Sequence, residues 1–382
     1  MNPALPRSEV PESWKTLRVI LCHDWLTGMR GGERVLELLC EAFPKAPVYT
    51  LIHNRRAISD TINRHPIHTS WLQHIPGIET HYRHFLPLFP LAIRSFNVPE
   101  ADLIISTSHC VAKGLRGRPG TPHLCYCFTP MRYAWLFHDE YLGGNLLKRQ
   151  LARPLLGWLR RWDRNTACRV TRFVGISRHI RDRILRFYNR EADVVYPPVD
   201  LARWTPDGKP AGDFDLIASA LVPYKKINLA VSAYNRSGRS LKIVGTGTEF
   251  NTLRAMAAPN IEFLGWQSDA SLLELYRRCR MLIFPGEEDF GIVPLEAQAC
   301  GRPVVAYGRG GALETVKPGV SGVFFAEQTP DALQAAIDDC ARREWDPAAI
   351  RTHAETFSIE AFFRGLDASI KQIPVAPGAT RP

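Results

Sequence analysis

One stretch of the chain, residues 281–316, restricts the fold more than any other. It opens with a short apolar run, Met281–Phe284, typical of a strand buried in a parallel sheet. A loop with Pro285 and three consecutive acidic residues follows, and a helix is predicted to begin near Val293. A second apolar strand, Arg302–Tyr307, comes next. This order of strand, loop, helix and strand predicts a parallel sheet covered by helices.

The loop before this helix is a candidate site for an anion. Free backbone N–H groups and the positive end of the helix dipole converge at a helix N-terminus. Glu288 lies in the loop, and Glu296 lies in the first turns of the helix. Because a carboxylate repels phosphate, Glu296 is better placed to accept hydrogen bonds from sugar hydroxyls, as an acid does in dinucleotide folds. The alternative is that Glu296 only favours the helix dipole and that Glu288 is solvated.

The same stretch reads E-D-F-G-x-x-P-x-E-A-x-A-x-G-x-P-V-V-A and is followed by G-G-x-x-E at residues 310–314. This pattern resembles the donor-site signature of glycosyltransferase family 4, whose members have the GT-B fold. The resemblance implies that the site takes a nucleotide diphosphate sugar. It assigns a catalytic role to Glu288, which would orient the sugar, and it implies donor binding by Phe290, Gly291, Ile292, Val293 and Glu296.

Strand candidates alternate with helical segments along all 382 residues. This alternation predicts an α/β protein with two Rossmann-like parallel-sheet domains that face a cleft. The expected boundaries are 1–198 for an acceptor-side domain, 199–356 for a donor domain, and 357–382 for a final helix and a frayed tail. The resemblance implies that this final helix returns to the first domain.

The first domain offers a glycine pair and a histidine as candidate site residues. Gly31 and Gly32 lie at a strand-to-helix turn, where glycine allows either a tight turn or close approach of a ligand. The resemblance implies that they border the donor diphosphate. His109 follows the strand candidate Ala101–Ser108, on the ligand side of an open α/β sheet. A lone histidine is more often structural, but the resemblance gives His109 a catalytic place near the transferred sugar.

A second loop of the first domain supplies the acceptor candidates. Residues 128–135 resemble the H-x-P-x-R-Y-x-W stretch of the mannosyltransferase-like branch known from O-antigen and exopolysaccharide assembly. Phe128 stands where that branch has histidine, which weakens any proton-transfer role for the loop. The remaining acceptor candidates are Arg132, Tyr133 and Trp135.

The donor domain departs from the family at its first strand. Family members usually read G-R-L-x-x-x-K there, and this chain has Ser219 and Ala220 in place of the glycine and arginine. The lysine is kept as Lys225, for which the resemblance implies a contact with the donor phosphates. We expect Lys226 or Lys113 to replace the missing arginine.

Further along the donor domain, the resemblance implies that backbone groups near Leu264 and Gly265 hold the nucleotide base. Asp213 and Asp215 match a metal-binding D-x-D pattern, but they begin a strand away from the signature, so we predict a structural role for them. We therefore expect a reaction without a metal ion and with no cofactor other than the nucleotide sugar.

Positive charge is concentrated in the first half of the chain. Residues 1–200 carry 28 Lys and Arg against 17 Asp and Glu, whereas residues 201–382 carry 20 against 21. The densest segment, Lys148–Arg172, has eight basic residues against Asp163 alone, with leucine and tryptophan interleaved. This pattern suits an anionic membrane surface, and a solvated arginine-rich helix face explains it equally well. No signal peptide or membrane span is evident, so we expect a cytoplasmic protein at the inner face of the plasma membrane.

The predicted function is transfer of a hexose, with mannose suggested by the branch, to a hydroxyl of a glycan acceptor that is lipid-linked. The family implies retention of configuration. The alternatives are a nucleotide-sugar epimerase of the same fold and a basic nucleic-acid-binding protein. The latter follows from the isoelectric point of about 9.3, but it does not explain the acidic pair, and no nucleic-acid-binding motif is present. The base, the sugar, the acceptor and the oligomeric state stay open.

Overall fold

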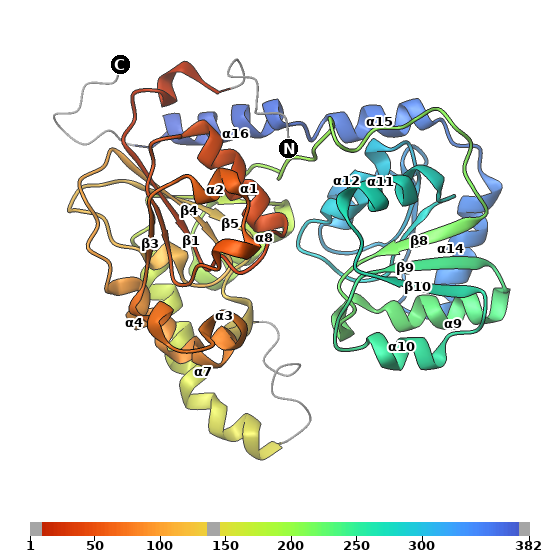
Figure 1. Ribbon diagram of the computed structural model, residues 1–382, viewed down its shortest axis with the longest axis horizontal. Helices are drawn as coiled ribbons and strands as arrows, with labels where there is room; N and C mark the ends of the chain where they lie inside the picture. Colours follow the sequence, from red (N-terminus) through yellow and green to blue (C-terminus); the bar gives the residue numbers. More distant parts are fainter. Residues whose placement is uncertain (1–9, 136–145, 374–382) are drawn as a thin grey trace. The chain divides into compact units, whose positions relative to one another are not determined.

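The computed structural model describes residues 10–135 and 146–373, with the side chains of 146–149, 151 and 152 left out. It divides into two compact units (Figure 1). Unit 1 comprises Met1–Tyr196 with Phe362–Pro382, and unit 2 comprises Pro197–Ala361. The tail expected from Pro374 onward lies outside the described residues.

Unit 1 is built on a seven-stranded sheet in the order β3-β2-β1-β4-β5-β6-β7, with every neighbouring pair parallel. The central strands are buried along their whole length, as their continuous apolar runs require. The strands are β1 Val19–His23, β2 Val48–Thr50, β3 Ile67–Thr69, β4 Leu103–Ser108, β5 His123–Cys127, β6 Arg172–Gly175 and β7 Ala192–Val194.

The helices of unit 1 differ widely in length. The region from His74 to Arg94, which has no clear periodicity in the sequence, forms short α- and 3-10 helices that include Pro87. The α-helices are α1 Gly31–Ala42, α2 Asp60–Asn63, α3 Ile78–His81, α4 Phe89–Arg94, α5 Arg132–Trp135, α7 Leu146–Ala167, α8 Arg178–Tyr188 and α16 Ile359–Lys371. The 3-10 helices are η2 Glu12–Trp14, η3 Arg55–Ala57, η4 Trp71–His74, η5 Tyr82–Leu88 and η6 Ala112–Gly114.

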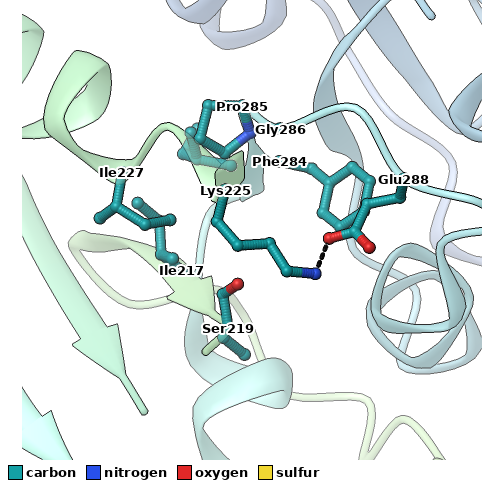
Figure 2. A pocket seen from close by; sticks show the side chains of 10 residues that line it. Ile217, Ser219, Lys225, Ile227, Phe284, Pro285, Gly286 and Glu288 are labelled. Atoms are coloured by element: carbon teal, nitrogen blue, oxygen red, sulfur yellow. Dashed lines mark hydrogen bonds and ion pairs between the residues drawn. The ribbon is translucent and has the colours of Figure 1, made fainter. Parts of the chain in front are cut away.

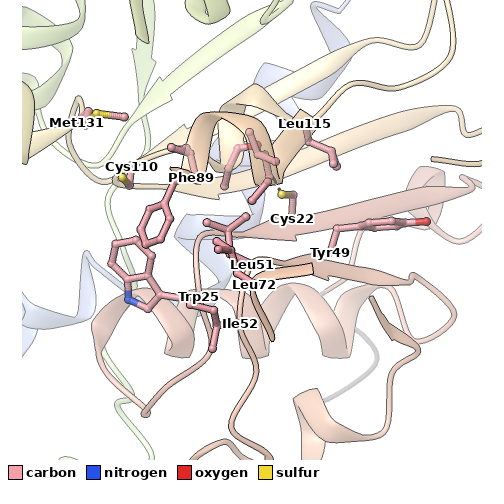
Figure 3. Packing of buried hydrophobic residues seen from close by; sticks show 14 of the residues in the cluster. Cys22, Trp25, Tyr49, Leu51, Ile52, Leu72, Phe89, Cys110, Leu115 and Met131 are labelled. Carbon is pink, nitrogen blue, oxygen red and sulfur yellow. Dashed lines mark hydrogen bonds between the residues drawn. The ribbon is translucent and has the colours of Figure 1, made fainter. Parts of the chain in front are cut away.

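The core of unit 1 lies between the sheet and these short helices (Figure 3). Trp25 packs against Phe89 with ring centroids 5.7 Å apart, beside Leu51 and Leu72. The irregular helices are thus held by burial of large apolar side chains rather than by their own periodicity.

The final helix, α16, packs on unit 1. Phe362 meets Tyr126 of β5 edge-on at 5.6 Å, and Phe363 meets Trp14 of η2 at 5.6 Å. Trp14 also donates a hydrogen bond from Nε1 to Asp367, at 3.0 Å. The resemblance implied that the last helix returns to the first domain, and the structure confirms this expectation.

Unit 2 is built on a six-stranded sheet in the order β10-β9-β8-β11-β12-β13, again with all neighbours parallel. Helices α9 and α10 lie on one face of this sheet and α11 and α12 on the other (Figure 1). The strands are β8 Phe214–Ala218, β9 Ser240–Val244, β10 Ile261–Gly265, β11 Leu282–Phe284, β12 Val304–Tyr307 and β13 Gly322–Phe325. The helices are η7 Pro223–Lys225, α9 Ile227–Ser237, α10 Phe250–Met256, α11 Asp269–Arg278, α12 Ile292–Ala299, α13 Ala312–Thr315, α14 Pro330–Arg342 and α15 Pro347–Glu355.

The predicted α/β class with two parallel-sheet domains is confirmed. The predicted strands Met281–Phe284 and Arg302–Tyr307 are one and two residues longer than β11 and β12, because their first residues lie in the loops before the sheet. Helix α15 was not foreseen from the sequence. Its start does carry a signal, since the Asp346 side chain accepts a hydrogen bond from the Ala348 N–H and Pro347 is the first helical residue.

Strand order fixes where each unit can bind a ligand. In unit 1 the chain builds outward from β1 through β2 to β3 and then continues at β4 on the other side of β1. In unit 2 it builds from β8 through β9 to β10 and continues at β11. Ligands of open parallel sheets bind beyond the carboxyl ends of the two strands at which this reversal occurs. These places are the ends of β1 and β4 in unit 1 and the ends of β8 and β11 in unit 2.

Candidate functional site

A pocket in unit 2 lies at the ends of β8 and β11 (Figure 2). It is small, with a cavity volume of about 10 Å³, and it opens to solvent. It is lined by Ile217, Ala218, Ser219, Lys225, Ile227, Ile283, Phe284, Pro285, Gly286 and Glu288. The pocket therefore occupies the position that the strand order assigns to a ligand.

Lys225 and Glu288 form an ion pair in this pocket (Figure 2). Lys225 ends η7, the 3-10 turn after β8, and Glu288 lies in the loop after β11. Their side chains are only 16% and 17% exposed. The structure thus brings together two residues that the sequence assigned to different parts of one ligand. A ligand with an anionic group for Lys225 and hydroxyl donors for Glu288 could replace this pair without leaving either charge unpaired.

The loop that carries Glu288 is fixed by the glycine pair of the signature. The Gly311 N–H donates to the Glu288 carbonyl at 2.8 Å, and Gly310 pairs with Glu288 as a parallel bridge. A Cβ atom on Gly311 would lie 2.3 Å from the Cα of Phe290, so only glycine allows this approach. Phe290 is itself buried and packs on Phe357 with ring centroids 6.0 Å apart.

Helix α12 begins directly after this loop, one residue earlier than predicted. Its N-cap, Gly291, has a left-handed backbone with φ of 96°, and no side chain caps the helix there. The N–H groups of Ile292 and Val293 lie in the first turn, where the helix dipole favours negative charge.

Glu296 lies in the second turn of α12 and is half-buried. Its Oε2 accepts a hydrogen bond from the Tyr276 hydroxyl at 2.9 Å. Burial, together with the Glu296 charge, raises the pKa of Tyr276 well above its usual value, so the phenol stays a donor. Tyr276 therefore holds the carboxylate of Glu296 in one orientation.

The two lysines expected to replace the family's missing arginine, Lys226 and Lys113, have different surroundings. Lys226 follows Lys225, is half-buried, and begins α9 with a left-handed backbone at φ of 55°. Lys113 is 2% exposed in unit 1, where its Nζ is ion-paired with the fully buried Asp163. The suggestion that Lys113 replaces the arginine is therefore wrong, because moving it would leave a buried carboxylate uncompensated.

Leu264 and Gly265 close β10, the edge strand of the unit 2 sheet. Gly265 has a left-handed φ of 65°, and its carbonyl accepts a hydrogen bond from the Gly245 N–H at 2.8 Å. Both residues thus lie at the same end of the sheet as the pocket, although neither lines it.

The aspartates of the D-x-D pattern lie at the start of β8. Asp215 is fully buried, accepts a hydrogen bond from the Tyr234 hydroxyl at 2.7 Å, and is paired with Arg280 at 3.0 Å. The structural role predicted for Asp215 agrees with these contacts, since both partners hold it inside unit 2. Within residues 10–135 and 146–373, no group of three or more His, Cys, Asp and Glu side chains could hold a metal ion.

In unit 1, His109 lies at the ends of β1 and β4. Its Nδ1 is 3.0 Å from the Oδ2 of Asp24, and its ring meets Trp25 edge-on with centroids 4.5 Å apart. The imidazole is 28% exposed and Asp24 is fully buried. Burial lowers the pKa of His109, and the Asp24 carboxylate opposes this shift.

The glycine pair of unit 1 opens α1 beside the same strand end. Gly31 has nothing within 4 Å of an added Cβ, whereas a Cβ on Gly32 would lie 3.2 Å from the Phe128 ring and 3.5 Å from His23. His23 Nδ1 is 2.7 Å from the Thr107 hydroxyl. A side chain at position 32 would therefore press on the Phe128 ring, whereas one at position 31 would meet open space.

The acceptor candidates lie in α5 and belong partly to the core of unit 1. Trp135 donates from Nε1 to Asp163 at 2.8 Å and stacks on Phe187 with centroids 4.7 Å apart. Tyr133 packs against the apolar core. Arg132 is half-buried and lies close enough to His109 to contribute to the lowering of its pKa.

Sequence reasoning missed the residues that hold the site residues in place, namely Asp24, His23, Asp163 and Tyr276. A signal existed for the first two, because a polar H-D pair directly follows a buried strand. No signal in the sequence marks Asp163 or Tyr276, since their partners are distant in the chain.

Two family models match this chain. The model described as "Glycosyltransferase Family 4" covers residues 29–203, and the one described as "Glycosyl transferases group 1" covers residues 210–356. A D-inositol 3-phosphate glycosyltransferase of Geodermatophilus obscurus is 34% identical over 202 residues, 45% of each chain. An uncharacterized glycosyltransferase of Methanocaldococcus jannaschii is 27% identical over 171 residues, 44% of this chain and 48% of that one. The chain spans about half the length of the curated relatives it matches.

Solved structures agree at the level of the fold. Anabaena HepE in complex with UDP and glucose has a TM-score of 0.68 at 17% identity, covering 93% of this chain and 100% of that one. The lipopolysaccharide outer core galactosyltransferase WaaB has a TM-score of 0.67 at 16% identity, covering 93% and 99%. The fold is that of the GT-B class. Within this class the chain is similar to family 4-like glycosyltransferases in both units, since one family model matches residues 29–203 and the other residues 210–356.

Proposed function

We propose that the protein transfers a hexose from a nucleotide diphosphate sugar to a hydroxyl of a glycan acceptor, with retention of configuration. The observation that carries this proposal is the unit 2 pocket, where Lys225 and Glu288 meet at the strand ends and α12 begins beside them. A cation, a carboxylate and a helix N-terminus suit a ligand that joins a diphosphate to a sugar.

The roles follow from the charges. Lys225 and the first-turn N–H groups of α12 would stabilise the departing diphosphate, which develops negative charge as the sugar leaves. Glu288 would orient the sugar hydroxyls, and Glu296, held by Tyr276, would accept from the ribose hydroxyls. His109 would accept from a hydroxyl of the transferred sugar, and α5 would contact the acceptor. Mannose and a GDP donor are favoured by the branch resemblance alone.

Thermal-shift measurements against GDP-, UDP-, ADP- and dTDP-sugars test the donor directly, because a ligand that binds only the folded state raises the melting temperature. We expect one nucleotide series to raise it. Incubation of that donor with and without glycan acceptors, followed by mass spectrometry, then separates transfer from epimerisation. Conversion of the sugar without any acceptor would favour the epimerase, and no stabilisation by any nucleotide sugar would contradict the proposal.

We further propose that helix α7 binds an anionic membrane surface on which a lipid-linked acceptor would lie. Leu155 and Trp158 of α7 are 39% and 42% exposed, and Arg153 and Arg161 of the same helix are exposed as well. Trp162, one turn beyond Trp158 on the same face, is buried, so the exposed apolar residues belong to the earlier turns of the helix. Exposed apolar and cationic side chains on one helix suit an interface with anionic lipids. None of the described helices is long and apolar enough to cross a bilayer.

The structure sharpens the choice of arginines for a test. Arg160 and Arg164 donate to the carbonyls of Ala134 and Phe187 at 2.7 and 3.0 Å, so their replacement would disturb unit 1 itself. The side chains of Lys148 and Arg149 lie outside the described part of the chain. Arg153 and Arg161 are the better positions for substitution.

The test compares Arg153→Gln/Arg161→Gln with the control Arg254→Gln/Arg342→Gln, which removes the same charge from exposed positions of unit 2. Sedimentation with phosphatidylglycerol vesicles should fall for the first variant and not for the second, and high salt should weaken wild-type binding. Binding to phosphatidylcholine vesicles should be absent. Equal sedimentation of all three proteins would contradict the proposal.

A further inference from the structure

The carboxylate of Asp24 is surrounded by N–H donors. Its Oδ2 accepts from the backbone N–H groups of His109 and Cys110 at 2.7 and 2.9 Å, and its Oδ1 accepts from those of Val111 and Ala112 at 2.6 and 2.7 Å. Four N–H donors are thus directed at the two oxygens, an arrangement that suits a carboxylate accepting on both of them. Asp24 therefore acts only as an acceptor.

This arrangement determines which nitrogen of His109 carries the proton. Nδ1 lies 3.0 Å from Oδ2 of Asp24, and since that oxygen can only accept, Nδ1 must be the donor. The edge-on contact with Trp25 fixes the ring plane as well. Burial lowers the pKa of His109, which favours the neutral imidazole at neutral pH. In a neutral imidazole with Nδ1 protonated, Nε2 carries a lone pair.

We infer that Asp24 is a positioning residue that holds His109 in the Nδ1–H form, so that Nε2 accepts a hydrogen bond from a ligand hydroxyl. No hydrogen bond from Nε2 to any residue in the described ranges is found, and the imidazole is partly exposed. A lone pair at Nε2 repels phosphate and carboxylate and accepts from a hydroxyl. The end of β1 and β4 is thus selective for the neutral, hydroxyl-bearing part of a ligand. The identification of that part as the transferred sugar rests on the proposed function.

The other ionisable groups around His109 are His23, Glu33 and Arg132, which influence its pKa in both directions. His23 lies 6.2 Å away between ring centroids, and its Nδ1 is engaged with Thr107. Among the described residues, Asp24 is the ionisable group in direct contact with Nδ1, and it can therefore set the tautomer.

The first measurement is long-range ¹H–¹⁵N correlation NMR of the full-length protein labelled at histidine nitrogens, with His109 assigned by its absence from His109→Asn. We expect Nδ1 to show the shift of a protonated nitrogen and Nε2 that of an unprotonated one. Protonation at Nε2, alone or together with Nδ1, at neutral pH would overturn the inference. This result does not depend on any substrate, so it stands or falls separately from the proposed function.

The second measurement uses Asp24→Asn and His109→Asn. In Asp24→Asn an amide N–H₂ replaces one acceptor, so the His109 tautomer should become mixed or reversed; an unchanged tautomer in a folded variant would contradict the inference.

In His109→Asn the amide can still donate to Asp24 but nothing occupies the Nε2 position. This variant should melt close to the wild-type temperature and lose at least tenfold in kcat with the active donor, while nucleoside diphosphate affinity stays within twofold. If Asp24→Asn does not fold, the wild-type spectrum decides.

Discussion

At the residue scale, the candidate sites of the two units are organised by carboxylates whose partners fix their direction. Glu288 is paired with Lys225, Glu296 receives the Tyr276 hydroxyl, and Asp24 holds His109. In each case one partner comes from a distant part of the chain, so the strand order of a sheet, not local sequence, brings the pair together.

Replacement of Glu296 tests its contact with the donor. Glu296→Ala removes a charged acceptor, which is worth about 1.5–3 kcal/mol, so the donor KM should rise by roughly 10- to 150-fold. Tyr276→Phe keeps the carboxylate and loses only the hydroxyl that orients it, so a smaller rise is expected. Steady-state kinetics at varied donor, with circular dichroism to verify folding, make the comparison. A donor KM unchanged in a folded Glu296→Ala would remove this residue from the donor site.

His123 makes unit 1 sensitive to acid. It is buried in β5 with Nε2 at 2.8 Å from the Ser106 hydroxyl, and burial lowers its pKa to about 4. An unfolded histidine has a pKa of about 6.5, so between these values the unfolded chain binds more protons than the folded one. The free energy of unfolding should therefore fall as the pH drops from about 6.5 to about 4, by at most about 3 kcal/mol from this residue. Urea unfolding of His123→Gln should show a correspondingly smaller fall, and identical pH dependence would refute the assignment.

At the scale of elements, the sequence predicts what local patterns determine. The strands at residues 282–284 and 304–307 and the helix between them follow from apolar runs, a proline and glycines, and all three are present. Lys225 and Glu288 could be predicted as site residues only through the resemblance, and their pairing could not be predicted at all, since 63 residues separate them. The role suggested for Lys113 was wrong because no local pattern reveals that Asp163 is buried beside it.

The conformation of the loop that carries Glu288 depends on glycine at position 311. Gly311→Ala places a Cβ against the Phe290 backbone, so the loop must move and Glu288 with it. Donor binding measured by thermal shift should be lost. The matched control is Gly157→Ala in α7, where a Cβ meets nothing within 4 Å and a better helix former should raise stability by up to about 1 kcal/mol. Full donor binding by Gly311→Ala would show that the loop tolerates the change.

At the scale of the whole molecule, the two sheets share the same reversal of strand order, and each carries one candidate site where that reversal occurs. Unit 2 offers a cation and a helix N-terminus for a diphosphate, and unit 1 offers the acceptor nitrogen of His109 for hydroxyls. Under the proposed function, Lys225 and the α12 N-terminus would supply the positive charge that neutralises the leaving group in place of a metal ion.

We therefore expect the transferase activity to survive EDTA. The measurement is the rate of sugar transfer before and after chelation and gel filtration, with Mg²⁺ and Mn²⁺ added back in parallel. Loss of activity that either ion restores would contradict a metal-independent reaction and would direct attention to acidic residues such as Asp213.

The central claim is that the pocket at the ends of β8 and β11 binds a nucleoside diphosphate through Lys225. Isothermal titration calorimetry with UDP and GDP on the wild type, on Lys225→Gln and on the exposed control Lys317→Gln tests it most directly. We predict that one of the two nucleotides binds the wild type and Lys317→Gln equally, and binds Lys225→Gln at least tenfold more weakly, since a charged hydrogen bond is worth about 1.5–3 kcal/mol. Equal affinity of Lys225→Gln and the wild type, or no binding of either nucleotide to any of the three proteins, would contradict the claim.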